Sequence, residues 1–284
     1  MIISIASGKG GTGKTTVACG LASVIPNSAY IDCDVEEPNG YILLKPEIKK
    51  EETAYKLIPK INHDKCDFCN KCSEVCEFNA LLNLKTEIYF LNELCHSCGA
   101  CAYFCPHQAI TEVKRETGKL RIGETYNNAL FFDAFLRIGE SSAAQLIKQI
   151  KNSYKGNRTV ILDSPPGTSC SMFEAVKDSD YCVLVTESTP FGLNDLKLAI
   201  IVLRQIKIPF GIVINKYDEQ FKKLDEYIHD SKLTLLLKIP FRMDVAESYS
   251  TGDLPTLIIE DYKSMILDLF DKVQNEILEN EFAL

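Results

Sequence analysis

Eight cysteines between Cys66 and Cys105 form the densest group of reactive side chains in the chain, which has twelve cysteines in all. They fall into two runs of identical spacing, C-x₂-C-x₂-C-x₃-C, made of Cys66, Cys69, Cys72 and Cys76, and of Cys95, Cys98, Cys101 and Cys105. Ala80-Leu81 recurs as Ala109-Ile110 at the same offset, which indicates an internal duplication. No secretory signal is recognisable, so metal binding is expected rather than a disulfide framework.

The spacing within each run is that of bacterial ferredoxins, which hold two 4Fe–4S clusters. The first three thiolates of a run surround one cluster, and the fourth reaches the other. The predicted ligand sets are therefore Cys66, Cys69, Cys72 and Cys105 for the first cluster, and Cys95, Cys98, Cys101 and Cys76 for the second. Two Cys₄ zinc sites are the alternative, but structural zinc sites usually take two C-x₂-C pairs separated by a longer loop. His96 and His107 are expected to be surface or hydrogen-bonding residues near a sulfur.

A second group of residues is suited to binding phosphate. Residues 8–15 read G-K-G-G-T-G-K-T, which matches GxxxxGK[ST] between an apolar strand and a helix. Glycines allow successive backbone N–H groups to point at phosphate oxygens, and the helix dipole adds positive potential. The predicted nucleotide-binding residues are Gly8, Gly10, Gly11, Thr12, Gly13, Lys14, Thr15 and Thr16. Lys14 is expected to reach the β- and γ-phosphates of ATP, and the Thr15 hydroxyl to bind Mg²⁺.

Three aspartates complete the predicted catalytic site. Asp163 ends the strand T-V-I-L-D and precedes S-P-P-G, so it is expected beside the phosphate loop, holding Mg²⁺ through water. Asp32 and Asp34 follow the second strand, in I-D-C-D-V-E-E-P-N, and either is a candidate to orient the attacking water or the metal. A plain strand-end cap remains the alternative for each of these two.

The elements that must position these residues alternate between strands and helices. Continuous apolar runs predict strands at Ile2–Ser7, Ser28–Asp32, Thr159–Leu162, Tyr181–Thr186, Phe210–Ile214 and Leu233–Ile239. Helices are predicted at Lys14–Val24, Ser142–Tyr154, Gly192–Gln205, Glu219–His229 and, packed at the end of the chain, Tyr262–Leu284. This order predicts a doubly wound, mostly parallel α/β sheet.

The cysteine block interrupts that alternation. Residues 61–111 are predicted to form an inserted, small α+β domain, and residues 1–60 with 112–284 the nucleotide-binding domain. Arg115–Lys119, which reads R-E-T-G-K, is predicted as a hairpin turn around Gly118 that leads the chain back.

Composition limits the classes of partner. The chain of 284 residues carries a net charge of −8, with 46% hydrophobic and 25% charged residues. This acidic balance argues against a protein that coats nucleic acid, because such binding rests on clustered Lys and Arg. No apolar stretch is long enough to span a bilayer, and the acidic final segment lacks the basic face of a membrane-surface helix. The expected location is the cytoplasm, with neither nucleic acid nor membrane as partner.

The chain outside the insert resembles the Mrp/MinD/ParA class of P-loop ATPases. The resemblance rests on Lys9 as an extra lysine in the phosphate loop, on D-C-D-V-E-E-P-N and D-S-P-P-G-T as the two switches, and on residues 185–197 and 213–216. It implies a Mg²⁺-dependent ATPase that dimerises around ATP, either with itself or with a similar chain. It also implies that Lys9 reaches the partner's nucleotide and that Asn215 reads the adenine.

As a whole, the chain resembles Mrp/MinD-type ATPases that carry an internal 4Fe–4S ferredoxin domain. The resemblance implies a protein in which the ATP state controls electron transfer through two clusters. A maturation factor for iron–sulfur clusters or metallocofactors is the alternative, and a spatial organiser of the MinD/ParA kind is a third. The redox partner or metalloprotein client is open. Cys19, Cys33, Cys170 and Cys182 are expected to be buried thiols, with a cluster ligand at the dimer interface as the alternative for Cys170.

Overall fold

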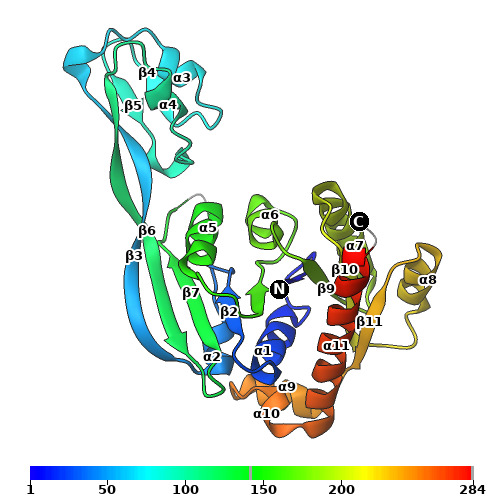
Figure 1. Ribbon diagram of the computed structural model, residues 1–284. Helices are drawn as coiled ribbons and strands as arrows, with labels where there is room; N and C mark the ends of the chain where they lie inside the picture. Colours follow the sequence, from blue (N-terminus) through cyan, green and yellow to red (C-terminus); the bar gives the residue numbers. More distant parts are fainter. Residues whose placement is uncertain (141–142, 283–284) are drawn as a thin grey trace.

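A nine-stranded sheet forms the centre of the protein in a computed structural model that describes residues 1–140 and 143–282. The strand order is β11-β10-β9-β1-β8-β2-β7-β6-β3 (Figure 1). The strands are β1 (Ile2–Ala6), β2 (Ala29–Asp32), β3 (Glu47–Ile61), β6 (Ile110–Glu124), β7 (Leu130–Leu136), β8 (Val160–Asp163), β9 (Tyr181–Glu187), β10 (Phe210–Tyr217) and β11 (Leu235–Pro240).

Strand direction confirms the predicted mostly parallel sheet. The strands from β11 to β7 pair in parallel, whereas β6 is antiparallel to both β7 and β3. The central strands β1, β8 and β9 are covered on both faces, which is why they read as continuous apolar runs. Their carboxyl ends lie at one edge of the sheet, where ligands bind in open α/β folds.

Helices cover both faces of the sheet. One face packs against α1 (Lys14–Val24), α2 (Gly40–Leu44), α9 (Met243–Ser250), α10 (Pro255–Ile258) and α11 (Glu260–Phe282). The other face packs against α5 (Ala143–Ser153), α6 (Cys170–Val176), α7 (Pro190–Ile206) and α8 (Lys222–Asp230). The doubly wound arrangement is therefore as predicted.

Element bounds agree closely with the prediction where apolar periodicity is strong. Helix α1 has the predicted bounds, and α11 begins two residues earlier than expected. Ser142 and residues 283–284, which were included in the predicted helices, lie outside the described residues. Strand β7 was not predicted, although it pairs with β2 inside the sheet.

The predicted hairpin turn at Arg115–Lys119 is wrong. These residues lie inside β6, which forms a long antiparallel ribbon with β3. The register of the ribbon shifts twice, between Ile48 and Lys50 and between Ala54 and Tyr55, and the second shift lies opposite Glu116–Gly118. Gly118 is needed for close approach rather than for a turn, because a Cβ atom there would lie 2.2 Å from the carbonyl oxygen of Phe135 on β7. The ribbon thus leaves the sheet edge as a continuous two-stranded stem.

The stem carries a small lobe that contains the eight clustered cysteines (Figure 1). It consists of η1 (His63–Lys65), α3 (Lys71–Glu74), β4 (Leu81–Asn83), β5 (Ile88–Phe90), η2 (Asn92–Leu94) and α4 (Ala100–Tyr103). Strands β4 and β5 form a separate antiparallel pair, and Leu81, Ile88 and Ile110 form a core of their own with Cys72. We call residues 61–111 the cysteine lobe.

Candidate functional site

The phosphate loop joins β1 to α1 and lines a cleft of about 500 Å³ at the carboxyl edge of the sheet. This is the size range of small-molecule sites. Residues 9–16 line the cleft together with Asp34, Pro166 and Asn215. Gly8 lies just behind it, where α7 approaches so closely that a Cβ atom would be 2.2 Å from the carbonyl oxygen of Asp195. The sequence predictions for this loop are therefore brought together in one place.

Lys14 lies at the buried end of the cleft and pairs with Asp163. Its Nζ is 2.9 Å from Oδ1 of Asp163, and both side chains are almost inaccessible to solvent. Burial acts to lower the pKa of Lys14, but the carboxylate of Asp163 outweighs it, so the pKa is raised and the lysine stays charged. The other oxygen, Oδ2 of Asp163, accepts a hydrogen bond of 3.0 Å from the hydroxyl of Tyr30. Asp163 is thus fixed from two sides.

The two aspartates after β2 differ in surroundings. Asp32 is buried, and its carboxylate accepts backbone N–H groups of Asp34 and Gly40, both at 3.0 Å. Burial and the nearby charge of Asp163 raise its pKa well above the usual value. Asp34 instead lines the cleft, and burial raises its pKa to about 6. Asp34, like Glu37, therefore faces the ligand space, whereas Asp32 holds the backbone of the segment that follows β2.

Lys9 forms an ion pair with Glu187, the last residue of β9. Lys216 reaches the same carboxylate at 3.7 Å and donates a hydrogen bond of 2.9 Å to the carbonyl of Gly11. Neither Glu187 nor Lys216 was predicted as a site residue, although they lie in segments 185–197 and 213–216, which carry the resemblance to P-loop ATPases. The positions of Glu187 at the end of β9 and of Lys216 near the end of β10 are the signal that could have found them, because parallel strands end at the ligand edge.

Asn215 lies in the cleft, where its amide supports the phosphate loop. Its Nδ2 donates a hydrogen bond of 2.8 Å to the carbonyl of Thr12. A Cβ atom on Gly13, whose φ is +84°, would lie 2.1 Å from that same nitrogen. The described contact is to the loop backbone, and recognition of adenine by Asn215 stays a prediction.

A further part of the cleft lining comes from a segment that was not predicted to contribute to the site. Phe241, Arg242 and Tyr249 lie after β11 and on α9, and they line the cleft with Asn215. Arg242 is held in place by ion pairs with Asp244 and Asp261. Aromatic and apolar side chains here offer a flat surface of the kind that nucleobases contact.

Two cavities in the cysteine lobe are each lined by four cysteines. The first contains Cys66, Cys69, Cys72 and Cys105, and the second contains Cys76, Cys95, Cys98 and Cys101. In each cavity three cysteines come from one run and the fourth from the other. The grouping coincides with the two sets expected from the spacing of the runs. Cys69 and Cys98 are the exposed member of each set.

The backbone of the lobe repeats along with the sequence. Positive φ angles occur at Phe68, Asn70 and Asn79 in the first half, and at Ser97, Gly99 and Gln108 at the matching places of the second. Left-handed conformations cost about 1–2 kcal/mol in residues other than glycine, so both loops are shaped against local preference. Such positions cluster at ligand-binding sites.

Backbone N–H groups point at the sulfur atoms of the lobe. Ala80 N donates to Sγ of Cys76, and Ala109 N donates to Sγ of Cys105, both at 3.3 Å. Burial raises the pKa of Cys101 to about 11, so binding of a metal by this thiol would require release of its proton. Four sulfurs facing one cavity, with N–H donors at the sulfur, fit a thiolate-bound metal cluster better than they fit an ordinary core.

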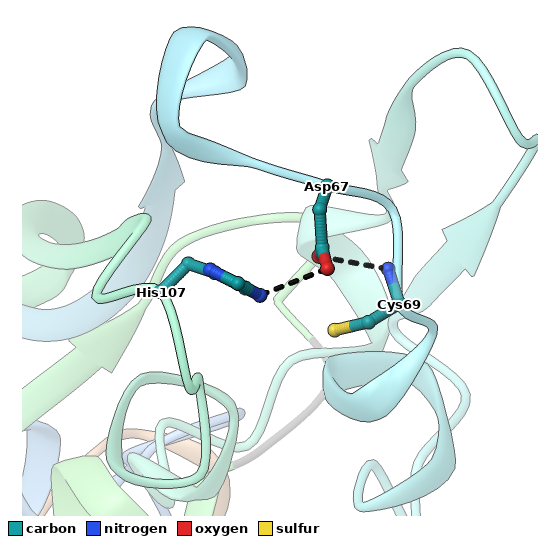
Figure 2. A group of neighbouring side chains, drawn as sticks. All are labelled: Asp67, Cys69 and His107. Atoms are coloured by element: carbon teal, nitrogen blue, oxygen red, sulfur yellow. Dashed lines mark hydrogen bonds and ion pairs between the residues drawn. The ribbon is translucent and has the colours of Figure 1, made fainter.

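A polar group lies at the rim of the first cavity (Figure 2). Nε2 of His107 is 2.8 Å from Oδ2 of Asp67, and the other oxygen of Asp67 accepts the N–H of Cys69 at 3.1 Å. The three side chains place possible metal-ligand atoms within 4.8 Å of one another, and all are exposed. At the second cavity, His96 stacks on Phe78 with ring centroids 3.7 Å apart. Both histidines therefore have partners beside the cysteines.

The four cysteines outside the lobe divide into two kinds. Cys19, Cys33 and Cys182 are buried, as predicted. Cys170 is exposed at the start of α6, so the expectation of a buried thiol is wrong for this residue. It follows the loop after Asp163, and that loop lines the nucleotide cleft through Pro166.

Within the part of the chain that the structure describes, no helix combines the length and the apolar character needed to cross a membrane.

Comparison with known proteins agrees with the geometry of the cleft. Two uncharacterised proteins of Methanocaldococcus jannaschii are similar to this chain over most of their length. MJ0578 is 34% identical over 98% of this chain and 94% of its own, and MJ0579 is 32% identical over 89% and 90%.

Among solved structures, the cell division ATPase MinD of Pyrococcus furiosus superposes with a TM-score of 0.60 at 18% identity, covering 96% of this chain and 98% of its own. MinD of Pyrococcus horikoshii, solved with Mg-ADP, gives a TM-score of 0.58 at 18% identity, covering 96% and 95%. These two likenesses establish a shared fold. The family model of the CobQ/CobB/MinD/ParA nucleotide-binding domain matches residues 3–256, and the chain therefore belongs to this family of nucleotide-binding proteins.

Proposed function

We propose that this protein is a Mg²⁺-dependent ATPase that holds two 4Fe–4S clusters in its cysteine lobe and couples its nucleotide state to electron transfer through them. The observation that carries the proposal is the pair of cavities, each lined by four cysteines drawn from both runs. The lobe is continuous with the sheet of the nucleotide-binding domain through β3 and β6. A cluster site built on that stem can respond to changes in the domain.

The residues of the cleft have distinct roles in this proposal. The loop N–H groups and Lys14 would bind the phosphates, and Thr15 and Asp163 would hold Mg²⁺, which would neutralise charge on the phosphates. Asp34, facing the cleft as a carboxylate above pH 6, orients the attacking water. Catalysis of phosphoryl transfer depends mainly on positioning and charge stabilisation, which these groups provide.

The clusters, when bound, would supply one-electron redox chemistry. Cys66, Cys69, Cys72 and Cys105 would hold one cluster, and Cys76, Cys95, Cys98 and Cys101 the other. The chain's own contribution is to bury one cysteine of each set, Cys72 or Cys95, to half-bury two more, and to leave Cys69 and Cys98 exposed. An exposed ligand places the cluster edge near the surface, where a redox partner can approach it.

Dimerisation around ATP is the remaining part of the proposal. Lys9 lies in the cleft and is partly exposed, but it is paired with Glu187 of its own chain. To contact a nucleotide bound by a second chain, Lys9 must leave this carboxylate. ATP binding, which brings negative charge close to Lys9, supplies a competing partner.

The test begins with the metal content of protein purified without oxygen. We expect about eight iron atoms and about eight acid-labile sulfides per chain, and EPR signals of two reduced 4Fe–4S clusters. About two zinc ions per chain without sulfide would overturn the proposal in favour of zinc sites. Cys182→Ser, which changes a buried cysteine of the sheet, serves as the control and should keep both clusters.

Coupling is tested by a redox titration with and without Mg-ATP. A tenfold difference in ATP affinity between the oxidised and reduced forms shifts a one-electron potential by about 59 mV. A shift of this order supports the proposal. Two clusters whose potentials, exposure and partner affinity are all insensitive to nucleotide would contradict coupled electron transfer.

One observation favours a second function, that of a maturation factor. The exposed ligands Cys69 and Cys98 also leave each cluster open to transfer. Transfer of iron and sulfide from the loaded protein to an apo-ferredoxin, faster with Mg-ATP, would support this function over electron transfer. A spatial organiser of the MinD kind is the third candidate, because this chain shares the fold of the MinD ATPases. Within the described part of α11, Tyr262, Ile266, Leu269 and Val273 pack into the core and most charged residues are acidic, which does not favour binding of this helix to an anionic membrane.

A further inference from the structure

The second cysteine loop, Cys95–Cys98, is attached to the nucleotide-binding domain by side chains that reach it from outside the lobe. Nζ of Lys56, on β3, donates a hydrogen bond of 3.0 Å to the carbonyl of Cys95. Nε2 of Gln145, on α5, donates to the carbonyl of His96. The backbone N–H of Leu57 donates to Oγ of Ser97 at 3.0 Å. Three successive residues of this loop are therefore held by the stem and by α5.

Lys56 is fixed by a buried charge cluster. Its Nζ lies 2.7 Å from Oε2 of Glu140, and the two side chains are 3% and 2% exposed. Arg115 of β6 approaches the other oxygen of Glu140 at 3.1 Å. Separating one member of a buried charge group from its partners leaves an uncompensated charge in the protein interior, which is strongly destabilising. The three side chains are therefore held in this one arrangement. Glu140 immediately precedes the part of the chain that leads into α5.

Helix α5 is connected in turn to α6. Nζ of Lys151 donates to three carbonyls at the end of α6, those of Glu174 at 2.8 Å, Ala175 at 3.0 Å and Lys177 at 2.8 Å. The two helices lie side by side on one face of the sheet (Figure 1). A displacement of α6 must therefore move α5 or break these three hydrogen bonds.

Helix α6 begins where the loop after Asp163 ends. That loop lies against the phosphate loop, because Gly167 N donates to the carbonyl of Ser7 at 3.0 Å and Pro166 lines the cleft. Asp163, at the other end of the loop, pairs with Lys14. A contiguous series of contacts thus connects the phosphate end of the cleft with the second cysteine loop.

The first cysteine loop has no such connection. Among the described residues, the hydrogen bonds and ion pairs of residues 66–72 stay within the lobe, for example Asn83 Nδ2 to the carbonyl of Phe68 and His107 to Asp67. The sequence places the lobe after Asp32 and Asp34, but the contacts that reach its second cysteine loop come from Gln145 on α5 and from Lys56 and Leu57 of the stem. A movement of α5 can therefore reach the second cavity through direct hydrogen bonds, whereas, within the described part of the chain, it cannot reach the first cavity in this way.

We propose that Lys56 and Gln145 are positioning residues for the second cysteine cavity, and that nucleotide binding acts on this cavity, and not on the first, through α6 and α5. The inference rests on the proposed function in taking the cavities as cluster sites. The two loops have matching backbone conformations, and they differ in that, among the residues that the structure describes, only the second is hydrogen-bonded to the stem and to α5. A coupling of this kind needs an element that both sites bias, and here that element is the α5–α6 pair.

Hydrogen–deuterium exchange on the cluster-loaded protein tests the proposal, with and without Mg-ADP and a non-hydrolysable Mg-ATP analogue. We expect nucleotide to change exchange in peptides that cover residues 95–99 and to leave residues 66–72 within about twofold. In Gln145→Ala the nucleotide-dependent change at 95–99 should fall at least about fivefold, with nucleotide affinity retained. Equal responses in the two loops, or in neither, would overturn the proposal.

Gln149→Ala is the matched control. It makes the same substitution one turn along α5 and removes a hydrogen bond of 2.9 Å to the carbonyl of Tyr55 in the stem, while the contact with the cysteine loop stays. We expect it to retain the nucleotide response at 95–99. A loss equal to that of Gln145→Ala would show a general loosening of α5 and would contradict the assignment.

An EPR measurement separates this inference from the proposed function. The signal of the second cluster is identified as the one that Cys98→Ser removes, and the signal of the first cluster as the one that Cys69→Ser removes. In wild-type protein, nucleotide should alter the signal of the second cluster and leave the signal of the first unchanged. In Gln145→Ala both signals should be present but neither should respond. Absence of iron would refute the proposed function, whereas two clusters that respond to nucleotide as strongly in Gln145→Ala as in wild type would refute only the inference.

Discussion

Nζ of Lys14 lies 2.9 Å from Oδ1 of Asp163, so the lysine that we propose as the phosphate ligand is paired with the carboxylate that we propose as a Mg²⁺ ligand. Both side chains are buried, where charge interactions are strong. Mg-ATP offers each of them a new partner at once, phosphate for the lysine and the hydrated cation for the carboxylate. If Lys14 and Asp163 exchange each other for these new partners, the carboxylate of Asp163 shifts, and the loop that follows Asp163 can move with it.

The hydroxyl of Tyr30 donates a hydrogen bond to the other oxygen of Asp163, Oδ2, and so restrains the carboxylate. We predict that Tyr30→Phe lowers kcat for ATP hydrolysis about tenfold, which corresponds to the loss of one hydrogen bond to a charged group. The ring should remain stacked on Phe131, so nucleotide affinity without Mg²⁺ should be retained. Steady-state kinetics over a range of Mg²⁺ concentrations checks this.

Tyr154→Phe is the control for this change. It removes a tyrosine hydroxyl that accepts the N–H of Arg158 at 2.6 Å, away from the cleft. Each variant should lose about 1 kcal/mol of unfolding free energy, because each loses one hydrogen bond. An equal fall of kcat in both variants would contradict a specific role for Tyr30.

Asp34 gives the ATPase reaction a predicted pH dependence. Burial raises its pKa to about 6, and the charge of Asp163 acts in the same direction, while Lys14 opposes it. Below pH 6 the carboxyl is neutral and accepts no proton from water, so kcat/KM should fall about tenfold per pH unit. Above pH 6 the carboxyl is ionised, so kcat/KM should not depend on pH through this group. Glu37→Gln, which also changes an acid of the cleft, should retain this pH dependence, whereas Asp34→Asn should abolish it along with most of the activity.

The same carboxyl links folding stability to pH with a definite sign. Its pKa is higher in the folded chain than in the unfolded chain, so the folded state holds the proton more strongly. The stability that this proton contributes is complete below about pH 4 and is lost as pH rises through about 6. Denaturant unfolding of wild type and Asp34→Asn across this range should show a decline in wild type that the variant lacks.

The predictable part of the fold is the part set by local pattern. The glycine motif between an apolar strand and a helix gave the bounds of α1 directly, and the duplicated cysteine spacing matched the membership of both cavities. In both cases most of the residues involved are close in sequence, and the fourth cysteine of each cavity follows from the known pattern of the duplicated spacing. Strand-end positions such as Asp163 were also predictable, because parallel strands end at the same edge.

The rest depends on contacts between distant segments. Strand β3 is rich in Lys and Glu and mostly exposed, so it lacks the apolar pattern of a strand and is stabilised by pairing with β6. Gly118 resembles a turn residue in sequence, yet it serves the close approach of β6 to β7. Glu187 and Tyr30 act through partners far away in the chain, and only the folded structure identifies these partners.

The pair of Lys9 with Glu187 leads to a prediction about assembly. If Lys9 must leave Glu187 to contact a partner's nucleotide, weakening this pair should favour the dimer. We predict that Glu187→Gln tightens ATP-dependent dimerisation about threefold to fivefold, as expected for a partly exposed ion pair worth up to about 1 kcal/mol. Sedimentation velocity with a non-hydrolysable ATP analogue measures this change.

Lys9→Ala provides the complementary variant. It should leave binding of Mg-ADP to the single chain within about twofold, because Lys14 supplies the main phosphate contact. It should weaken the ATP-dependent dimer and reduce hydrolysis. Dimer affinities that are unchanged in both variants would show that Lys9 acts only within its own chain.

The crossing of the two cysteine runs predicts an unusual pattern in double variants. Cys76 belongs to the first run but lies in the second cavity with Cys98, whereas Cys69 lies in the first cavity. We predict that Cys76→Ser with Cys98→Ser damages one cluster and leaves about four iron atoms per chain. Cys76→Ser with Cys69→Ser should damage both clusters, although these two residues belong to one run. Retention of one intact cluster in this second pair would mean that each run holds its own cluster, contrary to the arrangement of the cavities.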